Sequence, residues 1–342
     1  MSKFNILEWW NNSYPLDSSD RELLEKTRKT DTYDNLLSDD ITQYNYLCDC
    51  LFDKMPCCNL TTRDFWTITC DNCASNLINK LFFTYVDNDT LVIISNAEHE
   101  TTVNNFNKCK NGLILDHSKD IRGYNYDKVI NEAKKYKKVF FYCIGTQIST
   151  GEISPQTFFV ELKSKFNENK IPVIMVLDAV QEMFLEPRDY SIFDYIIGTG
   201  HAICWNYDLG LLIHKVGMPV HGFIDDEHLR EYSQILRVIL SRKEKINMFT
   251  RCIHEYFSYL LKRDEFSIIY DNAPQLCSIR CKGITFDEEL KELLDKYEIR
   301  IEAFGQETQF LRFRAQMFIK DDTLLLKGVN ILENYLKGLL DE

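Results

Sequence analysis

The 342-residue chain is predicted to fold as a large, mainly parallel α/β domain followed by a small α+β domain. In its middle part, short apolar runs alternate with stretches of helical spacing, which is typical of a parallel sheet covered by helices on both faces. After about residue 220 this alternation stops. We therefore expect an N-terminal helical segment over residues 1–60, the α/β domain over 61–222 and the small domain over 223–342.

The predicted strands and helices of the large domain follow from two patterns of apolar residues. Continuous, mainly apolar runs of four to seven residues predict buried strands, and apolar positions spaced by three and four predict amphipathic helices. The predicted strands are Leu91–Ser95, Val139–Ile144, Ile171–Leu177, Tyr195–Gly198 and Leu209–Ile213, and the predicted helices are Ala74–Phe83, Tyr126–Tyr136 and Pro155–Phe166.

The small domain is predicted to begin with a long helical region, because Asp226–Lys262 contains neither proline nor glycine. Short apolar runs then predict strands, with helices between and after them. The predicted strands are Ser267–Tyr270, Leu276–Cys281, Arg300–Ala303 and Phe310–Arg314, and the predicted helices are Asp287–Tyr297 and Thr323–Leu340.

Composition excludes several classes of function. The net charge of −12 disfavours a nucleic-acid partner, because a negative surface repels phosphate backbones. No window approaches 18 apolar residues, and Met1–Trp10 lacks the pattern of an export signal, so we expect no membrane partner and a cytoplasmic location. The twelve cysteines include one C-x-x-C pair, Cys70 and Cys73, without an obvious second pair. We therefore expect free thiols and no metal site.

Polar residues follow three of the predicted strands. His99 follows the first strand, Asp178 and Gln181 follow the third, and Thr199 and His201 follow the fourth. Ligands of open α/β sheets bind beyond the carboxyl ends of the strands, so these residues are candidates for one binding site. An aspartate in this position can also serve only to cap the next helix.

These motifs, in this order, resemble the cysteine desulfurase and class V aminotransferase family of pyridoxal phosphate (PLP) enzymes. Leu-Asp-Ala-Val-Gln is similar to the family motif in which the aspartate, here Asp178, pairs with the pyridine nitrogen and the glutamine, here Gln181, bonds the ring oxygen. Ala-Glu-His-Glu resembles the segment whose histidine, here His99, stacks on the ring. Gly-Thr-Gly-His resembles the segment that brings Thr199 and His201 near the phosphate.

The resemblance extends over roughly residues 60–340. Leu-Arg-Phe-Arg is similar to the late strand whose arginine, here Arg312, holds a substrate carboxylate, and an arginine fork suits that group. Thr146–Pro155 resembles a loop that contacts cofactor or substrate. The resemblance implies the PLP-dependent transferase-like fold (fold type I), a seven-stranded sheet, PLP as the cofactor and a homodimer.

The family's Schiff-base lysine should follow His201, where this chain has Ala202. Alanine can neither bond to the cofactor nor carry a proton. Two explanations compete: a deliberate lysine-to-alanine change that traps a bound substrate, or a natural protein that binds without turnover. We favour the first, because the positions that contact the ring keep the family's residues.

Two further positions depart from the family. The phosphate-binding turn is replaced by Asp71-Asn72-Cys73-Ala74-Ser75-Asn76. Asn72, Cys73 and Ser75 are candidate phosphate contacts, and Asp71 would repel phosphate if it pointed inward. No cysteine follows Cys281, and Cys277 and Cys281 lie in a predicted strand, so the persulfide chemistry of a desulfurase is disfavoured.

The resemblance thus implies a PLP-dependent enzyme that acts on a small amino acid through an external aldimine and an α-carbanion. We expect a lyase that catalyses β-elimination rather than an aminotransferase, and an inactive form because of Ala202. The alternatives are a natural non-catalytic binding protein on the same fold and a cysteine desulfurase.

Overall fold

The computed structural model describes residues 66–147, 150–183, 188–199, 210–215, 217–220, 262–268, 276–282, 289–290, 308–314 and 330–338. The predicted N-terminal segment, the predicted strand Arg300–Ala303 and nearly all of the predicted helix Asp226–Lys262 lie outside the described residues.

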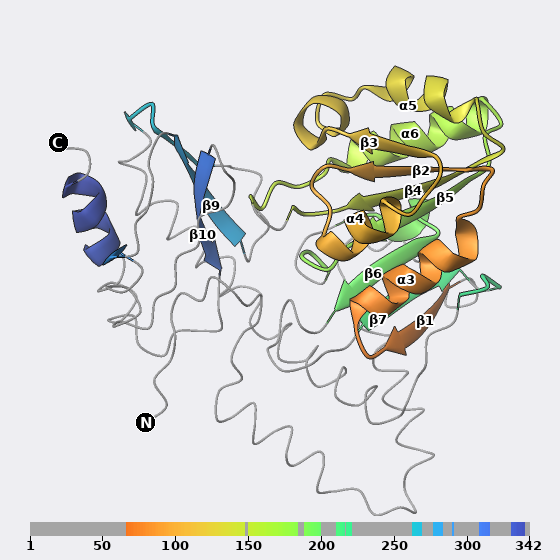
Figure 1. The fold of residues 1–342 in the computed structure, drawn as a ribbon, viewed down its shortest axis with the longest axis horizontal. Coiled ribbons are helices and arrows are strands. Elements are labelled where there is room, and N and C mark those ends of the chain that lie inside the picture. Colours follow the sequence, from red (N-terminus) through yellow and green to blue (C-terminus); the bar gives the residue numbers. More distant parts are fainter. Residues whose placement is uncertain are drawn as a thin grey trace, which may run out of the picture.

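A seven-stranded sheet forms the centre of the described structure (Figure 1). Its strand order is β1-β7-β6-β5-β4-β2-β3, and β7 alone runs antiparallel to its neighbours. The predicted mainly parallel sheet is therefore confirmed. The strands are β1 (Trp66–Asp71), β2 (Thr90–Ser95), β3 (Gly112–Leu115), β4 (Lys138–Ile144), β5 (Val173–Asp178), β6 (Tyr195–Thr199) and β7 (Gly210–Lys215).

Helices cover both faces of this sheet, with α3 (Ala74–Tyr85) and α4 (Glu100–Phe106) on one side and α5 (Tyr126–Ala133) and α6 (Gln156–Glu168) on the other (Figure 1). The contacts of strand β4 on both faces of the sheet explain why its sequence is continuously apolar. The Phe140 ring contacts Phe82 of α3 with centroids 5.0 Å apart, whereas the next ring, Phe141, lies 6.5 Å from Phe158 of α6. Successive side chains of a strand point to opposite faces, so a sheet buried on both faces needs apolar residues at every position.

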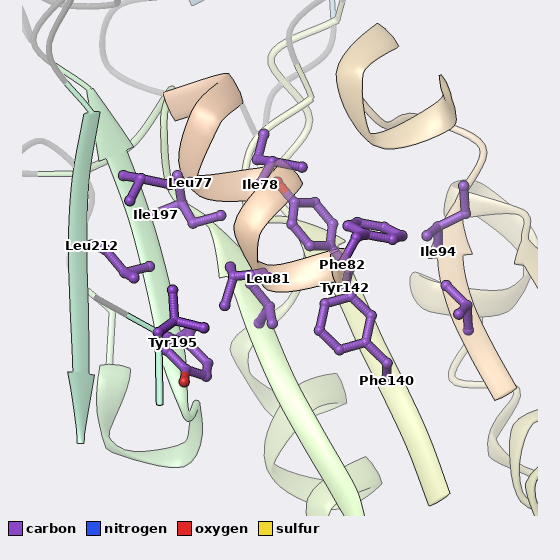
Figure 2. Packing of buried hydrophobic residues seen from close by; sticks show 13 residues of the cluster. Leu77, Ile78, Leu81, Phe82, Ile94, Phe140, Tyr142, Tyr195, Ile197 and Leu212 are labelled. Atoms are coloured by element: carbon purple, nitrogen blue, oxygen red, sulfur yellow. The ribbon is translucent and has the colours of Figure 1, made fainter. Parts of the chain in front are cut away.

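The core beneath α3 follows from the helical spacing of its apolar residues. Leu77, Ile78, Leu81 and Phe82 form one stripe that packs on the strands (Figure 2). Figure 2 shows Tyr195 of β6 beside this stripe, and its hydroxyl lies 2.5 Å from that of Tyr85 at the end of the helix. Helix α3 is thereby fixed on β6 and β7, which also fixes the position of its first turn.

Three further strands form a separate antiparallel sheet of order β10-β9-β8. They are β8 (Phe266–Ile268), β9 (Leu276–Lys282) and β10 (Thr308–Arg314), which confirm three of the predicted strands. Residues 330–338 are helical and bury Leu332 and Leu336, within the predicted helix Thr323–Leu340.

The sequence analysis did not predict β1, β3 or α4. Strand β1 alternates threonine with apolar residues, β3 has four residues, and α4 has seven with few apolar ones, so each carries a weak periodic signal. The predicted helix Tyr126–Tyr136 ends earlier, at Ala133. None of the helices in the described part of the chain is long and apolar enough to cross a membrane.

Candidate functional site

The candidate site lies at one edge of the sheet, where several strand ends meet. Asp178, the last residue of β5, pairs with Ile144 at the end of β4. Thr199 at the end of β6 pairs with Gly210, which in turn pairs with Asp71 at the end of β1. Because β7 runs antiparallel, its first residue lies at the same edge as the last residues of its neighbours. Asp178 and Thr199, two of the strand-end residues that the sequence singled out, thus lie at the same edge.

Asp178 is a buried carboxyl group at the centre of this edge, with 2% of its surface exposed. The Tyr142 hydroxyl donates to its Oδ2 over 2.7 Å, and the backbone N–H of Val180 donates to its Oδ1 over 3.0 Å. Burial raises the pKa of Asp178, and these two hydrogen bonds oppose the rise. A buried carboxylate of this kind favours a cationic donor as its next partner.

Glu98 is a second carboxyl group at this edge, and the sequence analysis did not assign it a role. Its Oε1 accepts hydrogen bonds from the Ser95 hydroxyl at 2.5 Å and from the backbone N–H of Ile144 at 2.9 Å, so it links the ends of β2 and β4. Part of the residue is exposed, but Oε2 is buried and has no hydrogen-bond partner among the described residues.

Burial is the main cause that raises the pKa of Glu98 to about 8. The hydrogen bond from Ser95 lowers this pKa, and the negative charge of Asp178 raises it further. Two carboxyl groups therefore share the edge, and their mutual repulsion favours one proton between them. The signal that could have identified Glu98 is its place in the motif Ala-Glu-His-Glu, next to His99.

His99 lies at the first turn of α4, as its N-cap residue. Its Nδ1 accepts a hydrogen bond from the backbone N–H of Thr101 over 3.2 Å, which leaves Nε2 to carry the proton of the neutral ring. The residue is exposed, and a positive charge on its ring would lower the pKa of Asp178, so the two side chains lie close enough to interact. His99 is therefore available to contact a ligand above Asp178.

Gln181 and Thr199 complete the described part of the predicted site. Gln181 is buried in the turn that follows β5, and Thr199 is buried at the end of β6. The backbone N–H of Ala179 donates to the Ile197 carbonyl over 2.8 Å, which holds this turn against β6.

The carboxylate of Asp71 is held by neighbouring residues of the chain and is not free to face the site. Its Oδ1 accepts hydrogen bonds from the backbone N–H of Asn72 at 2.7 Å and from Asn76 Nδ2 at 3.0 Å, and its Oδ2 forms an ion pair with Lys80. Burial would raise the pKa of Asp71, but the hydrogen bonds from Lys80, Asn76 and Asn72 outweigh burial and lower it. The carboxylate is ionised, and Lys80 matches its charge.

The first turn of α3 lies close to the start of β7. A Cβ atom on Gly210 would lie 2.5 Å from the carbonyl carbon of Cys73 and 2.7 Å from the nitrogen of Ala74, so only glycine allows this approach. Cys73 is the N-cap residue, and its side chain makes no capping hydrogen bond. The N–H groups of the first turn can therefore bind an anion such as a phosphate. Asn72, the other predicted contact, is exposed beside this turn.

The remaining predicted residues are only partly described. His201 and Ala202 lie outside the described residues. Arg312 lies in β10, where it pairs with Ser278 of β9, and its side chain is outside the description. Cys281 is a buried free thiol in β9.

The residues that are present fit the two ends of a PLP molecule. A protonated ring nitrogen would supply positive charge beside Asp178 and Glu98, whose carboxyl groups are buried together. A phosphate would find backbone donors at the first turn of α3, at the same edge. Both features are observed independently of the sequence motifs.

Comparisons with known proteins agree with this architecture. No protein-family model and no curated protein sequence matches the chain. Among solved structures, a NifS-like protein from Rickettsia africae has a TM-score of 0.71 and 12% identity, covering 94% of this chain and 99% of its own. Another NifS-like protein has a TM-score of 0.69 and 13% identity, covering 95% and 98%. The cysteine desulfurase CsdA from Escherichia coli has a TM-score of 0.68 and 13% identity, covering 95% of each chain.

At this level of identity, the comparisons establish the fold. The seven-stranded, mainly parallel sheet and the helices on its two faces match these structures over nearly their whole length. The chain has the fold type I architecture of the NifS-like proteins to which it is similar.

Proposed function

We propose that this chain binds PLP at the carboxyl edge of its large sheet and belongs to the PLP-dependent enzymes that act on small amino acids. The observation that carries the proposal is the buried carboxyl group of Asp178, which lies beside Glu98 and His99 at the end of β5. The similar structures include a cysteine desulfurase, which is the family that the sequence motifs resemble, and this supports the proposal.

The residues of the chain have distinct roles in this proposal. PLP supplies an electron sink for negative charge at the α-carbon of an amino acid. Asp178 would keep the ring nitrogen protonated, and His99 would contact the ring. The first turn of α3, from Cys73 onward, holds the phosphate together with Thr199. Arg312 holds the substrate carboxylate through its two-pronged guanidinium group.

Position 202 limits the chemistry of the chain as it stands. Ala202 cannot form the covalent bond to the cofactor or carry the α-proton. We propose that this form is inactive and that the counterpart with lysine at this position is a lyase that catalyses β-elimination, in preference to an aminotransferase. The absence of cysteine after Cys281 in the sequence disfavours a persulfide-forming desulfurase.

A natural binding protein without turnover is the second candidate. Ala202 favours it, because a natural alanine at this position would leave binding without turnover.

The deciding experiment compares the chain with its Ala202→Lys variant after addition of PLP. We expect the variant to gain a visible absorption band that borohydride fixes onto residue 202, and we expect an amino acid from a panel of small ones to change that band. The double variant Ala202→Lys/Asp178→Asn is the matched control, and its band should shift or weaken. If neither the chain nor the lysine variant binds PLP, the enzyme proposal fails and the binding-protein candidate replaces it.

Several broader features also remain proposals. We propose that the chain is cytoplasmic and has no nucleic-acid or membrane partners. We also propose that it forms a homodimer, which light scattering of the purified protein tests. We also propose that the chain divides at about residue 222, so limited proteolysis should cut first near that position.

A further inference from the structure

A buried ion pair lies behind the candidate site, and neither the sequence motifs nor the proposed roles include it. Arg188 donates through Nε to Glu182 Oε1 at 2.5 Å and through Nη2 to Glu182 Oε2 at 2.9 Å. The two side chains are 2% and 0% exposed. Glu182 directly follows Gln181 in the turn after β5, so the pair is attached to the Asp178 motif.

The same pair is bonded to both ends of the segment 145–154, which leaves the carboxyl end of β4. Arg188 donates to the Ser154 carbonyl at 3.0 Å and to the Gly145 carbonyl at 3.4 Å. On the other side of the pair, the Thr146 hydroxyl donates to Glu182 Oε2 at 2.8 Å. One guanidinium group thus connects the turn after β5 with the start and the end of a second loop.

The two arms of the segment 145–154 pair with each other as in a hairpin, and residues 148 and 149 between them lie outside the described residues. Thr146 forms an isolated antiparallel bridge with Ile153, and the backbone N–H of Ser154 donates to the Gly145 carbonyl over 2.7 Å. The N–H of Gly145 donates in turn to the Asp178 carbonyl over 2.8 Å, so the hairpin starts directly beside the candidate site. We call the segment 145–154 the β4 hairpin.

Gly145 also shows how closely the β4 hairpin rests on the ion pair. A Cβ atom at this position would lie 2.4 Å from both Cδ and Oε1 of Glu182. No larger residue fits there unless Glu182 moves. The Glu182 carboxylate therefore fixes the position of Gly145, where the hairpin begins.

Stability alone does not explain a pair buried in this way. The cost of removing two charges from water often exceeds their attraction, and apolar replacements of a buried pair are often equally stable or more stable. What an apolar pair cannot supply is the set of directed hydrogen bonds to the two loops. The pair is best explained by the geometry that it imposes.

We propose that Glu182 and Arg188 are positioning residues that fix the β4 hairpin against the turn carrying Asp178 and Gln181, and that this placement shapes the ligand site between them. The part that concerns the ligand rests on the proposed function.

The test uses the full chain and three variants. Glu182→Leu/Arg188→Met removes the pair without leaving a single buried charge, and Arg188→Lys keeps the charge but loses the fork. Lys163→Met is the matched control, because it removes a partly buried ion-pair partner of Asp194, which precedes β6 at the opposite edge of the sheet.

Two readouts separate positioning from general stability. Hydrogen exchange followed by mass spectrometry reports on the amides of the β4 hairpin, and calorimetry measures binding of pyridoxine 5′-phosphate, which lacks the reactive aldehyde. In the double variant we expect hairpin amides to exchange about ten-fold faster or more, with β4 and β5 unchanged. We expect affinity for pyridoxine 5′-phosphate to fall by about ten-fold. Arg188→Lys should show smaller changes in the same direction, and Lys163→Met should show neither.

The possible results lead to different conclusions. Unchanged exchange in the hairpin, or faster exchange across the whole sheet, overturns the positioning role. Faster hairpin exchange with unchanged affinity overturns the link to the ligand site. If the unmodified chain does not bind pyridoxine 5′-phosphate, the proposed function fails, and the exchange data alone decide the positioning role. If the double variant does not fold, Arg188→Lys supplies the same comparison.

Discussion

Replacement of Glu98 by glutamine tests the electrostatics of the candidate site without any ligand. Glutamine can accept the same hydrogen bonds from Ser95 and Ile144 but cannot ionise. Among the groups that interact with the Glu98 charge, Tyr142 and Cys143 have pKa values raised mainly by burial and stay neutral, so Asp178 is the titrating neighbour. The variant therefore isolates the ionisation of one buried carboxyl group.

The magnitude follows from the pKa of Glu98, which rises from 4.5 to about 8 in the folded chain. The folded state then holds a proton that the unfolded state releases, so stability is lost as the pH rises from about 4.5 towards 8. Each pH unit of difference corresponds to about 1.4 kcal/mol, which gives a total of about 5 kcal/mol. Of this total, about 3 to 4 kcal/mol falls between about pH 5 and about pH 8.

The assay is urea unfolding of the full chain and of Glu98→Gln at several pH values, followed by circular dichroism. We expect the free energy of unfolding of the unmodified chain to fall with pH relative to that of the variant. The absolute stability of the variant is not the readout, since the glutamine amide has its own pH-independent burial cost. Glu100→Gln, at the exposed first position of α4, should follow the unmodified chain. Parallel pH profiles for the chain and Glu98→Gln would refute the reasoning.

Three further predictions test the core, the phosphate end and the ring end of the site. Phe158→Ala should lower the free energy of unfolding by about 3 to 5 kcal/mol, because the ring is fully buried among three other rings, whereas Phe83→Ala, at a residue that is 92% exposed, should change it little in the same denaturation assay. Gly210→Val should push the first turn of α3 away from β7 and weaken inorganic phosphate binding in a calorimetric titration, and equal affinity would contradict the close approach described for this glycine. Asp178→Asn should weaken binding of pyridoxine 5′-phosphate by about ten-fold or more, since it removes a charge-assisted hydrogen bond. Unchanged affinity would show that Asp178 does not interact with the ring nitrogen.

The sequence predicted the parts of the fold whose signals are local. Strands β4 and β5 are continuous apolar runs because both faces are covered, and helix α3 carries an apolar stripe of ordinary spacing. The weak periodicity of β1 left it unpredicted, although its pairing with β7 brings Asp71 to the site edge. Such pairing depends on partners that are distant in the sequence.

The candidate site was predictable only where a motif names the residue. Asp178 was identified because it ends a strand, whereas Glu98 was not, because a glutamate near a helix start is ordinarily exposed. The Glu182–Arg188 pair was not identified either. Its function depends on Gly145 and Ser154, which lie far from it in the sequence and reach it only through the packing of β4 beside β5.

The acidic groups at this edge differ in how their charge is balanced. That difference indicates where a positively charged ligand group would bind. Glu182 has a bidentate partner in Arg188, so its charge is matched within the described structure. Asp178 and Glu98 are buried without an ion-pair partner of lysine or arginine among the described residues, and the folded chain compensates by keeping a proton between them. A cation that enters beside Asp178 would replace that proton. Ligand binding should therefore release protons between about pH 5 and about pH 8, and it should release fewer in Glu98→Gln.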